Sequence, residues 1–371
     1  MVEATSLEPA PDTVTGTSDV IDRLRRSSEY VVMPLLALAV SGLIFSLFLL
    51  ALGKSPADFF ALVWRGGYGT SFSWQNTLVR SAPLVFTALC VAIPARLGLV
   101  IIGGEGALVL GGFAAAAIAI PMVAWSSSWL LLAVMASASA LAGAIWIGFV
   151  GYLRHYRGVN ETISSLLLFY IAVSILNFFV EGALRDPSDP NKPSTLPIGK
   201  ENMIGTIPGT DVHWGLVFGI LLCALLYLLM NRTTFGFAAR ITGGNLRAAQ
   251  AQGLPVGKLM VISCAIAGAC AGFAGFFEVA AIHGKANASL IAGYGFTGIL
   301  VSFLARHNPL VIVPVAIFLG GIEASGGLIQ RRMDLPDATV LVLQGLIFLV
   351  LLVSETFYGR LGFFRPKGDA S

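Results

Sequence analysis

The longest uncharged stretch of the chain runs from Ala107 to Leu153, 47 residues without a single Asp, Glu, Lys or Arg. As one helix it would be about 70 Å long, whereas a helix of about 20 residues already crosses a bilayer. The stretch must therefore fold back as two membrane-spanning helices. We predict the turn at Trp125–Trp129, where three serines separate two tryptophans, because tryptophan favours the membrane interface.

Composition extends this conclusion to the whole chain. Hydrophobic residues make up 56% of the 371 residues and charged residues 12%, against roughly 45–50% and about 25% in soluble domains. A soluble fold could not cover so much apolar surface with so few charges. The predicted fold class is therefore all-α, a polytopic membrane helical bundle. The net charge of +3 is too small to indicate a polyanion, so we predict no nucleic-acid partner.

Further apolar stretches bring the predicted number of transmembrane segments to about ten. Besides the two in 107–153, they cover residues 31–52, 77–97, 162–180, 214–230, 259–277, 296–305, 310–322 and 338–354. The second is predicted to be broken or re-entrant, because its charge-free part is only 15 residues long and Pro83 and Pro94 interrupt it. We expect residues 1–29 and 358–371 to form cytoplasmic tails on either side of a transmembrane domain at 30–357.

Two polar stretches separate these spans. Residues 181–213 contain five prolines and are predicted to form an external loop. Residues 231–255 are hydrophilic and basic. With ten alternating spans and both termini in the cytoplasm, most of the 23 lysines and arginines fall on the cytoplasmic side, as membrane proteins favour. We predict this orientation, in which the outward-facing pair Arg331–Arg332 is the exception.

A glycine-rich segment, Gly103-Gly104-Glu105-Gly106, lies between the second and third apolar stretches. Glycines permit tight turns and the close approach of another group. A carboxylate beside so much apolar sequence is costly and usually functional. We predict that these four residues line a substrate pathway. The alternative is a glycine-rich turn with a solvated glutamate.

Other polar residues lie in or near the predicted spans. They are Asn160, Glu161, Asn177, Glu278, Glu323 and Gln344. We assign the first three to the pathway, since polar groups inside a membrane are usually functional. For Asn160 and Glu161, capping of the fifth span is an equally good interpretation, because they begin it. Glu278 and Glu323 lie at span ends, and we expect them to be interfacial.

The basic stretch contains a short predicted helix over residues 246–252. Asn245 suits its N-cap, and Gly253 suits the position after its C-terminus, with Pro255 beyond. A helix of under two turns is marginal alone and must dock on something. Both an ordinary interfacial helix and docking to a partner protein remain open. In the seventh span, the spacing of Gly268 and Gly272 predicts close packing of another helix.

Motifs of enzymes are missing. The chain has no Walker A motif, no protease or hydrolase signature and no metal-ligand spacing, and its four cysteines lie in apolar stretches. We therefore predict no catalytic residue, no cofactor and no metal site. Two classes remain open at this point: a membrane transport protein, such as an ion-coupled carrier or channel, and an intramembrane enzyme. The last lacks any nucleophile–base or metal constellation.

Four segments resemble the membrane permease subunits of bacterial ATP-binding-cassette (ABC) importers in the branched-chain amino acid and simple sugar group. The closest similarity is to its nucleoside or simple-sugar branch. The segments are Gly103–Gly106, Val159–Ile163, Gly236–Leu254, and Gly295–Ile299 followed by Asn308–Leu310. They follow the family's order over roughly residues 30–357. Three positions depart from the family by being apolar: Ile101, Ala107 and Phe169.

This resemblance implies a plasma-membrane importer of bacteria for a small polar solute such as a simple sugar or nucleoside. It implies four kinds of partner: the lipid bilayer, two cytoplasmic ATPase subunits, a second permease subunit and an extracytoplasmic solute-binding protein. ATP hydrolysis would then occur in a separate subunit, so this chain is not an enzyme. The resemblance assigns ATPase coupling to residues of the short-helix segment. They are Arg240, Gly244, Asn245, Ala248, Ala249 and Gly253.

Overall fold

The computed structural model describes residues 18–123, 127–189 and 191–356. It divides into two compact units. The smaller unit comprises the chain up to Phe48 and from Gly345 onward, and the larger comprises Leu49–Gln344. Within the described residues the only extended pairings are two isolated bridges, which confirms the predicted all-helical class.

The smaller unit contains most of α1 (Ser18–Ala51) and the greater part of α14 (Ala338–Thr356). On α1, Met33, Ala37 and Phe45 are buried, whereas Leu43 and Leu47 on other faces are exposed. An outward face of leucines suits contact with lipid. Residues 18–29 of the predicted tail are the first turns of α1. The rest of that tail and residues 358–371 lie outside the described part of the chain.

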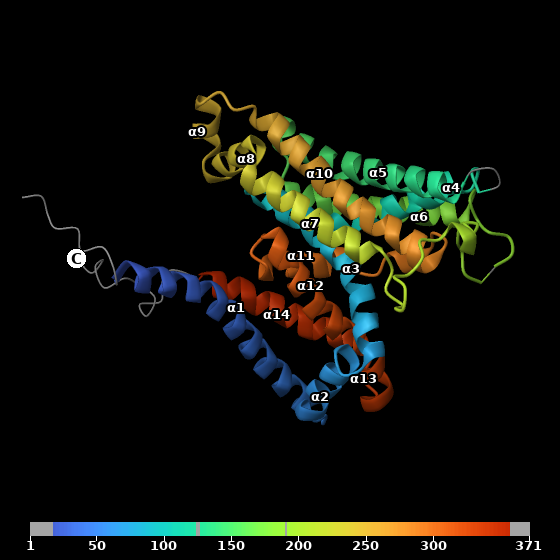
Figure 1. The fold of residues 1–371 in the computed structure, drawn as a ribbon, viewed down its shortest axis with the longest axis horizontal. Coiled ribbons are helices and arrows are strands. Elements are labelled where there is room, and N and C mark those ends of the chain that lie inside the picture. The colour runs from blue at the N-terminus through green and yellow to red at the C-terminus, as the bar shows by residue number, and fades with distance from the viewer. Residues whose placement is uncertain (1–17, 124–126, 190, 357–371) are drawn as a thin grey trace, which may run out of the picture. The chain divides into compact units, whose positions relative to one another are not determined.

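The larger unit holds the remaining elements (Figure 1). They are α2 (Pro56–Gly67), α3 (Ser71–Ala95), α4 (Gly104–Ala119), α5 (Ser128–Arg157), α6 (Glu161–Glu181), the short η1 (Lys200–Asn202), α7 (Gly215–Arg232), α8 (Thr234–Gly244), α9 (Leu246–Ala251), α10 (Val256–Phe277), the π-helical η2 (Glu278–His283), η3 (Ala288–Leu290), α11 (Tyr294–Leu304), α12 (Pro309–Ala324) and α13 (Gly326–Met333).

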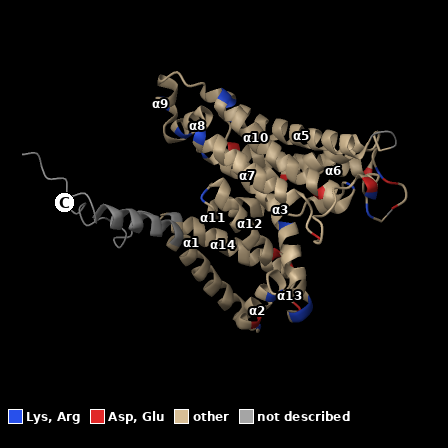
Figure 2. Ribbon diagram, viewed as in Figure 1, with Lys and Arg blue, Asp and Glu red and all other residues tan. Residues whose placement is uncertain are grey.

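Seven helices of the described chain are long and apolar enough to cross a membrane. They cover Val32–Ala51, Ser71–Ala95, Ser128–Arg157, Glu161–Glu181, Gly215–Arg232, Val256–His283 and Pro309–Met333. Three shorter apolar helices cover Gly104–Ala119, Ala288–Leu304 and Ala338–Ser354. Figure 2 shows the middle of α5, α7 and α10 without charged residues. The polytopic helical architecture is confirmed. Seven of the described helices qualify as spans by length and composition, so the expected number of ten is not confirmed.

The second expected span is one continuous helix. α3 runs through Pro83 from Ser71 to Ala95, so the expected interruption is not found. The helix begins six residues earlier than predicted, because the Thr70 hydroxyl accepts the backbone N–H of Ser73 at 3.0 Å and caps it. It also packs against α7, α10, α11 and α12. This packing outweighs the one backbone hydrogen bond that Pro83 removes.

The uncharged 47-residue stretch folds back as predicted, since α4 and α5 pack against each other. Trp125 and Ser126 of the expected turn lie outside the described residues. The predicted close packing at Gly268 is also confirmed, with α5 as the partner (Figure 1). A β-carbon on Gly268 would lie 2.0 Å from the carbonyl oxygen of Gly143, and one on Gly272 would lie 2.1 Å from that of Ser139.

The segment between α6 and α7 is held by backbone hydrogen bonds to the residues that follow α10. The backbone N–H of Thr195 donates to the carbonyl of Ala286 at 2.9 Å, and that of Ile204 donates to Ala280 at 2.8 Å. At the other end of α7 and α10, the basic stretch forms α8 and α9 (Figure 1). The two polar segments therefore lie at opposite ends of the same spanning helices.

Candidate functional site

The carboxylate of Glu105 is completely buried in the first turn of α4. One oxygen accepts the backbone N–H of Gly293 at 2.7 Å, and the other accepts that of Gly295. Gly293 is the N-cap of α11 and Gly295 lies in its first turn. The first N–H groups of a helix have no partner within the helix, and its N-terminus attracts negative charge. Glu105 therefore holds the start of α11 with both oxygens.

Glycines bring three helices together at this point. A β-carbon on Gly103 would lie 2.1 Å from the carbonyl oxygen of Ser165, and one on Gly106 would lie 2.9 Å from the Cα of Phe169. Both neighbours belong to α6. A β-carbon on Gly295 would lie 2.3 Å from the backbone nitrogen of Glu105. The segment Gly103–Gly106, in which Gly104 is also buried, thus forms a tight junction of α4, α6 and α11.

Residues just before Gly103 form hydrogen bonds with the first turns of α6. The backbone N–H of Ile102 donates to the Ser165 hydroxyl at 3.2 Å. The Thr162 hydroxyl donates to the carbonyl of Val100 at 2.9 Å. Residues 100–103 are therefore held by α6 before α4 begins.

The other predicted pathway residues lie along α6. Asn160 is the N-cap, and its side-chain oxygen accepts the N–H of Ile163 at 3.1 Å. Glu161 is buried and pairs with Arg154 across 3.1 Å. Asn177 is half-buried, about two turns beyond Phe169. In the part of the chain that the structure describes, none of these three side chains forms a hydrogen bond or ion pair with Glu105, and Asn160 and Glu161 serve the beginning of the helix.

Sequence reasoning expected Glu278 and Glu323 to be interfacial, but the structure buries polar atoms of both. Glu278 lies 3.3 Å from the Nε2 of His283 through one oxygen, and its other oxygen has no hydrogen-bond partner among the described residues. One oxygen of Glu323 and the side-chain nitrogen of Gln344 are likewise buried without a partner there. The only sign of these residues in the sequence was an ionisable or amide side chain within an apolar stretch. Whether such a side chain is buried depends on helix packing, which the sequence does not show.

The short predicted helix is present as α9. The side-chain oxygen of Asn245 accepts the N–H of Ala248 at 3.0 Å, which confirms the predicted N-cap. Gly253 has a φ of +77°, the left-handed conformation expected after the C-terminus. Ala248 is exposed and Gly244 has open space around it, whereas Ala249 is completely buried. The exposed face of α9 thus includes the small side chain of Ala248, and Gly244 at the end of α8 is also uncovered in this chain.

α8 attaches α9 to the ends of two spanning helices. A β-carbon on Gly236 would lie 2.2 Å from the carbonyl oxygen of Met230, at the end of α7. Arg240 donates to the same carbonyl at 3.3 Å. A β-carbon on Gly243 would lie 2.2 Å from the carbonyl oxygen of Arg96, directly after α3. The backbone of α8 therefore packs directly against the end of α7 and the residue that follows α3.

A second contact connects this region to α11. The Arg96 guanidinium donates to the carbonyl of His307 at 3.3 Å, in the turn between α11 and α12. The His307 Nδ1 lies 2.9 Å from the hydroxyl of Ser302, inside α11. Burial, together with the neighbouring Arg96 charge, lowers the pKa of His307 to about 4. α11 therefore runs between the Arg96–His307 contact at one end and Glu105 at the other.

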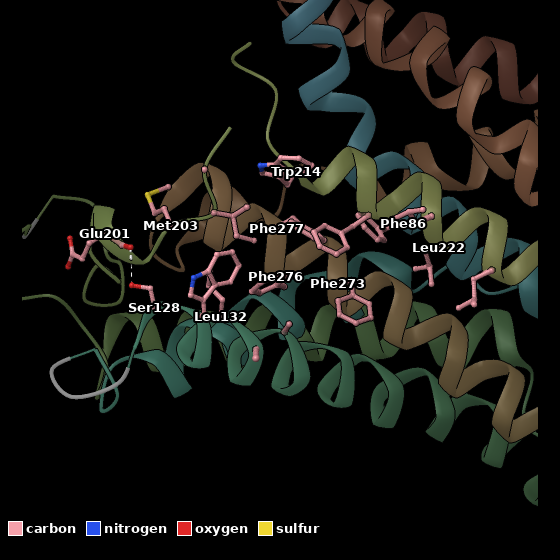
Figure 3. Close-up of a pocket in the computed structure, with 18 residues that line it drawn as sticks. Phe86, Ser128, Leu132, Glu201, Met203, Trp214, Leu222, Phe273, Phe276 and Phe277 are labelled. Carbon is pink, nitrogen blue, oxygen red and sulfur yellow. Dashed lines mark hydrogen bonds between the residues drawn. The ribbon is translucent and has the colours of Figure 1, made fainter. Parts of the chain in front are cut away.

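An apolar cavity lies elsewhere in the larger unit. It has a volume of about 930 Å³ and is lined by α5, α7, α10 and residues 201–205. Figure 3 shows Phe86, Phe273, Phe276 and Phe277 around it, with Trp214 toward one end. None of the predicted pathway residues lines it. Its aromatic and aliphatic lining suits acyl chains better than a hydrated solute.

Residues 73–352 match the family model described as branched-chain amino acid transport system / permease component. The chain is 31% identical over 346 residues to a glucose ABC transporter permease protein of Haloferax volcanii, covering 88% of this chain and 87% of that protein. It is 28% identical to a guanosine ABC transporter permease protein of Bacillus subtilis, covering 92% and 98% of the two chains. A nucleoside ABC transporter permease protein of Lactococcus lactis is 22% identical, over 88% and 92%.

Proposed function

This chain belongs to the family of branched-chain amino acid transport system permease components, and we propose that it forms the pathway for a small polar solute such as a simple sugar or a nucleoside. It is the membrane permease subunit of an ABC importer, and ATP hydrolysis belongs to separate subunits. Relatives named for glucose, guanosine and nucleosides support this class of solute.

The observation that carries the proposal is the connection from α9 to Glu105. α9 exposes Ala248, α8 packs against the ends of α3 and α7, and Arg96 joins that region to the α11–α12 turn. Closure of the ATPase pair would move α9, and α11 would carry the movement to the junction of α4 and α6. Such rigid movement of packed helices is one established route of switching.

Coupling residues divide into two groups in this proposal. Ala248 and Gly244 belong to the exposed face that contacts the ATPase. Asn245 caps the start of α9 and Gly253 follows its C-terminus. Arg240 in α8 and Ala249 in α9 contact other parts of this chain. This division follows from exposure, since a buried side chain cannot contact a partner without rearrangement.

The pathway is proposed to pass beside the junction at Gly103–Gly106. Glu105 positions the start of α11, and the nearby α6 contributes Asn160, Glu161 and Asn177. The unpartnered polar atoms of Glu278 and Gln344 are further hydrogen-bonding groups available to a polar solute when the bundle rearranges. A sugar or nucleoside needs such groups because it gives up hydrogen bonds to water on entering the membrane.

We propose ten transmembrane segments, with the three shorter apolar helices also entering the membrane and both termini in the cytoplasm of a bacterial cell. In the plasma membrane the chain would pair with a second permease subunit, identical or homologous. Two ATPase subunits would contact α8 and α9, and a solute-binding protein would contact the opposite side. Each of the two permease subunits would then form one half of the solute pathway.

Reconstitution tests the proposal. The chain is inserted into lipid vesicles with its ATPase and binding protein, and uptake of labelled sugars and nucleosides is measured with and without ATP. We expect uptake of one of these solutes only with ATP and all components. Uptake driven by an ion gradient, without the ATPase, would instead identify a secondary carrier.

A further inference from the structure

A basic cavity of about 510 Å³ lies between the turn before α2, α2 itself and the end of α13. Its charged lining consists of Lys54, Arg65 and Arg332, together with the single carboxylate of Asp58. Residues far apart in the sequence thus place three cations against one anion. Arg332 belongs to the arginine pair that stood out as an exception in the charge distribution of the sequence.

One of the cations is fixed in place. The Lys54 Nζ donates to the carbonyl of Met333 at 2.6 Å, at the C-terminal end of α13. The last carbonyls of a helix carry partial negative charge, so this contact partly compensates the positive charge of Lys54. It also ties the start of α2 to the end of α13 and thereby forms the wall of the cavity.

The guanidinium groups of the two arginines remain available to bind an anion. Arg65 lies in the last turn of α2 and Arg332 in the last turn of α13, and both are exposed. Among the described residues, the ion pairs involve other side chains, so neither guanidinium is neutralised by a carboxylate there. Two unpaired guanidinium groups beside one cavity match the oxygen geometry of a phosphate group.

Aromatic side chains place the cavity at the surface of the bilayer. Trp64 on α2 is 68% exposed and Phe72 at the start of α3 is 73% exposed. Phe60 and Trp74 are also exposed beside them. Exposed aromatic residues at the end of a spanning helix mark the level of the lipid headgroups. Because the exposed Trp64 directly precedes Arg65, we expect the cavity near the depth of the phosphates. Ala61 and Leu62 add an apolar part to its lining.

We propose that this cavity binds the phosphate-bearing headgroup of an anionic phospholipid. Arg65 and Arg332 contact the phosphate oxygens, Lys54 adds positive charge, and the aromatic side chains contact the upper acyl chain. The exposed aromatic residues on α2 and at the start of α3 favour a lipid over an acidic protein surface, which would need a wet, polar rim. The inference rests on the chain crossing a membrane and not on the solute that it carries.

The test uses the purified full-length chain in detergent and native mass spectrometry. Phosphatidylglycerol and phosphatidylcholine with identical acyl chains compete for binding. We expect the wild-type chain to retain phosphatidylglycerol selectively, and the double variant Arg65→Ala/Arg332→Ala to lose about tenfold in that preference. Arg331→Ala is the matched control, because it removes the same charge from the same helix at a position that does not line the cavity.

Three results would overturn the proposal. The first is equal binding of the two lipids by the wild-type chain. The second is an Arg331→Ala effect as large as that of the double variant. The third concerns the binding protein, whose affinity is measured in nanodiscs of phosphatidylcholine alone. If the double variant weakens that affinity and leaves lipid preference unchanged, the cavity is a protein-docking surface. The single variants Arg65→Gln and Arg332→Gln replace the double variant if it fails to fold.

Discussion

Glu105 accepts the backbone N–H of Gly295, and a β-carbon on Gly295 would lie only 2.3 Å from the backbone nitrogen of Glu105. The two residues are 190 positions apart in the sequence. Each therefore requires the other: the carboxylate needs the helix N-terminus, and the close approach needs the glycine. The starts of α4 and α11 are fixed together at this point.

Glu105→Gln is expected to lower both stability and uptake. A glutamine can accept one of the two N–H groups, but its own NH₂ then faces the other donor. Leaving one buried donor without an acceptor costs about 1–3 kcal/mol. Thermal unfolding in detergent and uptake by the reconstituted complex measure the two effects. If both were unchanged, Glu105 would be no more than a turn residue.

Ala248→Arg and Ala249→Arg are both expected to abolish transport, but for different reasons. Ala248 is exposed, so arginine there leaves the chain folded and blocks association with the ATPase. Ala249 is completely buried, so arginine there disrupts α9 and lowers stability. Copurification of the ATPase and the unfolding temperature are measured for both variants. A folded Ala248→Arg chain that retains its ATPase would show that α9 is not the docking surface.

Gly268→Ala is expected to destabilise the chain. Its β-carbon would meet the carbonyl oxygen of Gly143, and two backbones must then separate, at a cost of about 1–3 kcal/mol. Gly345→Ala is the control, because it lies in α14 with nothing within 4 Å of the new carbon. The control should gain about 0.5–1 kcal/mol from higher helix propensity. Equal unfolding temperatures for the two variants would contradict close packing of α5 and α10.

Stability is expected to fall as the pH drops below about 6.5, in part through His307. Its pKa is about 4 in the folded chain and 6.5 as the ordinary value. Between these values the unfolded chain binds a proton that the folded chain does not, so acid favours unfolding. The contribution is complete above pH 6.5 and is lost toward pH 4. His307→Gln should reduce the difference in unfolding temperature between pH 7 and pH 5.5, and an unchanged difference would contradict this assignment.

Local features were predictable from the sequence. The uncharged stretch required a reversal, the Gly268–Gly272 spacing required a close neighbour, and Asn245 and Gly253 marked the ends of α9. Each of these rests on interactions within a few residues or on a property of the residue itself. The family resemblance added the order of the segments and the expected role of α9.

Other features depended on contacts that a sequence does not display. α3 continues through Pro83 because four helices pack around it. The direction of Ala249 is set by the packing of α9 on its own chain. Glu105 could be singled out as an isolated carboxylate, but its partners on α11 follow only from the fold. The same holds for the gathering of Lys54, Arg65 and Arg332 in one cavity.

Copurification tests the central claim, that this chain works as the permease subunit of an ATP-driven importer. The tagged chain is isolated in mild detergent, and the proteins that accompany it are identified by mass spectrometry. We predict a cytoplasmic ABC ATPase, together with a second permease subunit that is a copy of this chain or a homologue. Isolation of the chain alone, with transport intact in vesicles that lack ATP, would contradict the account.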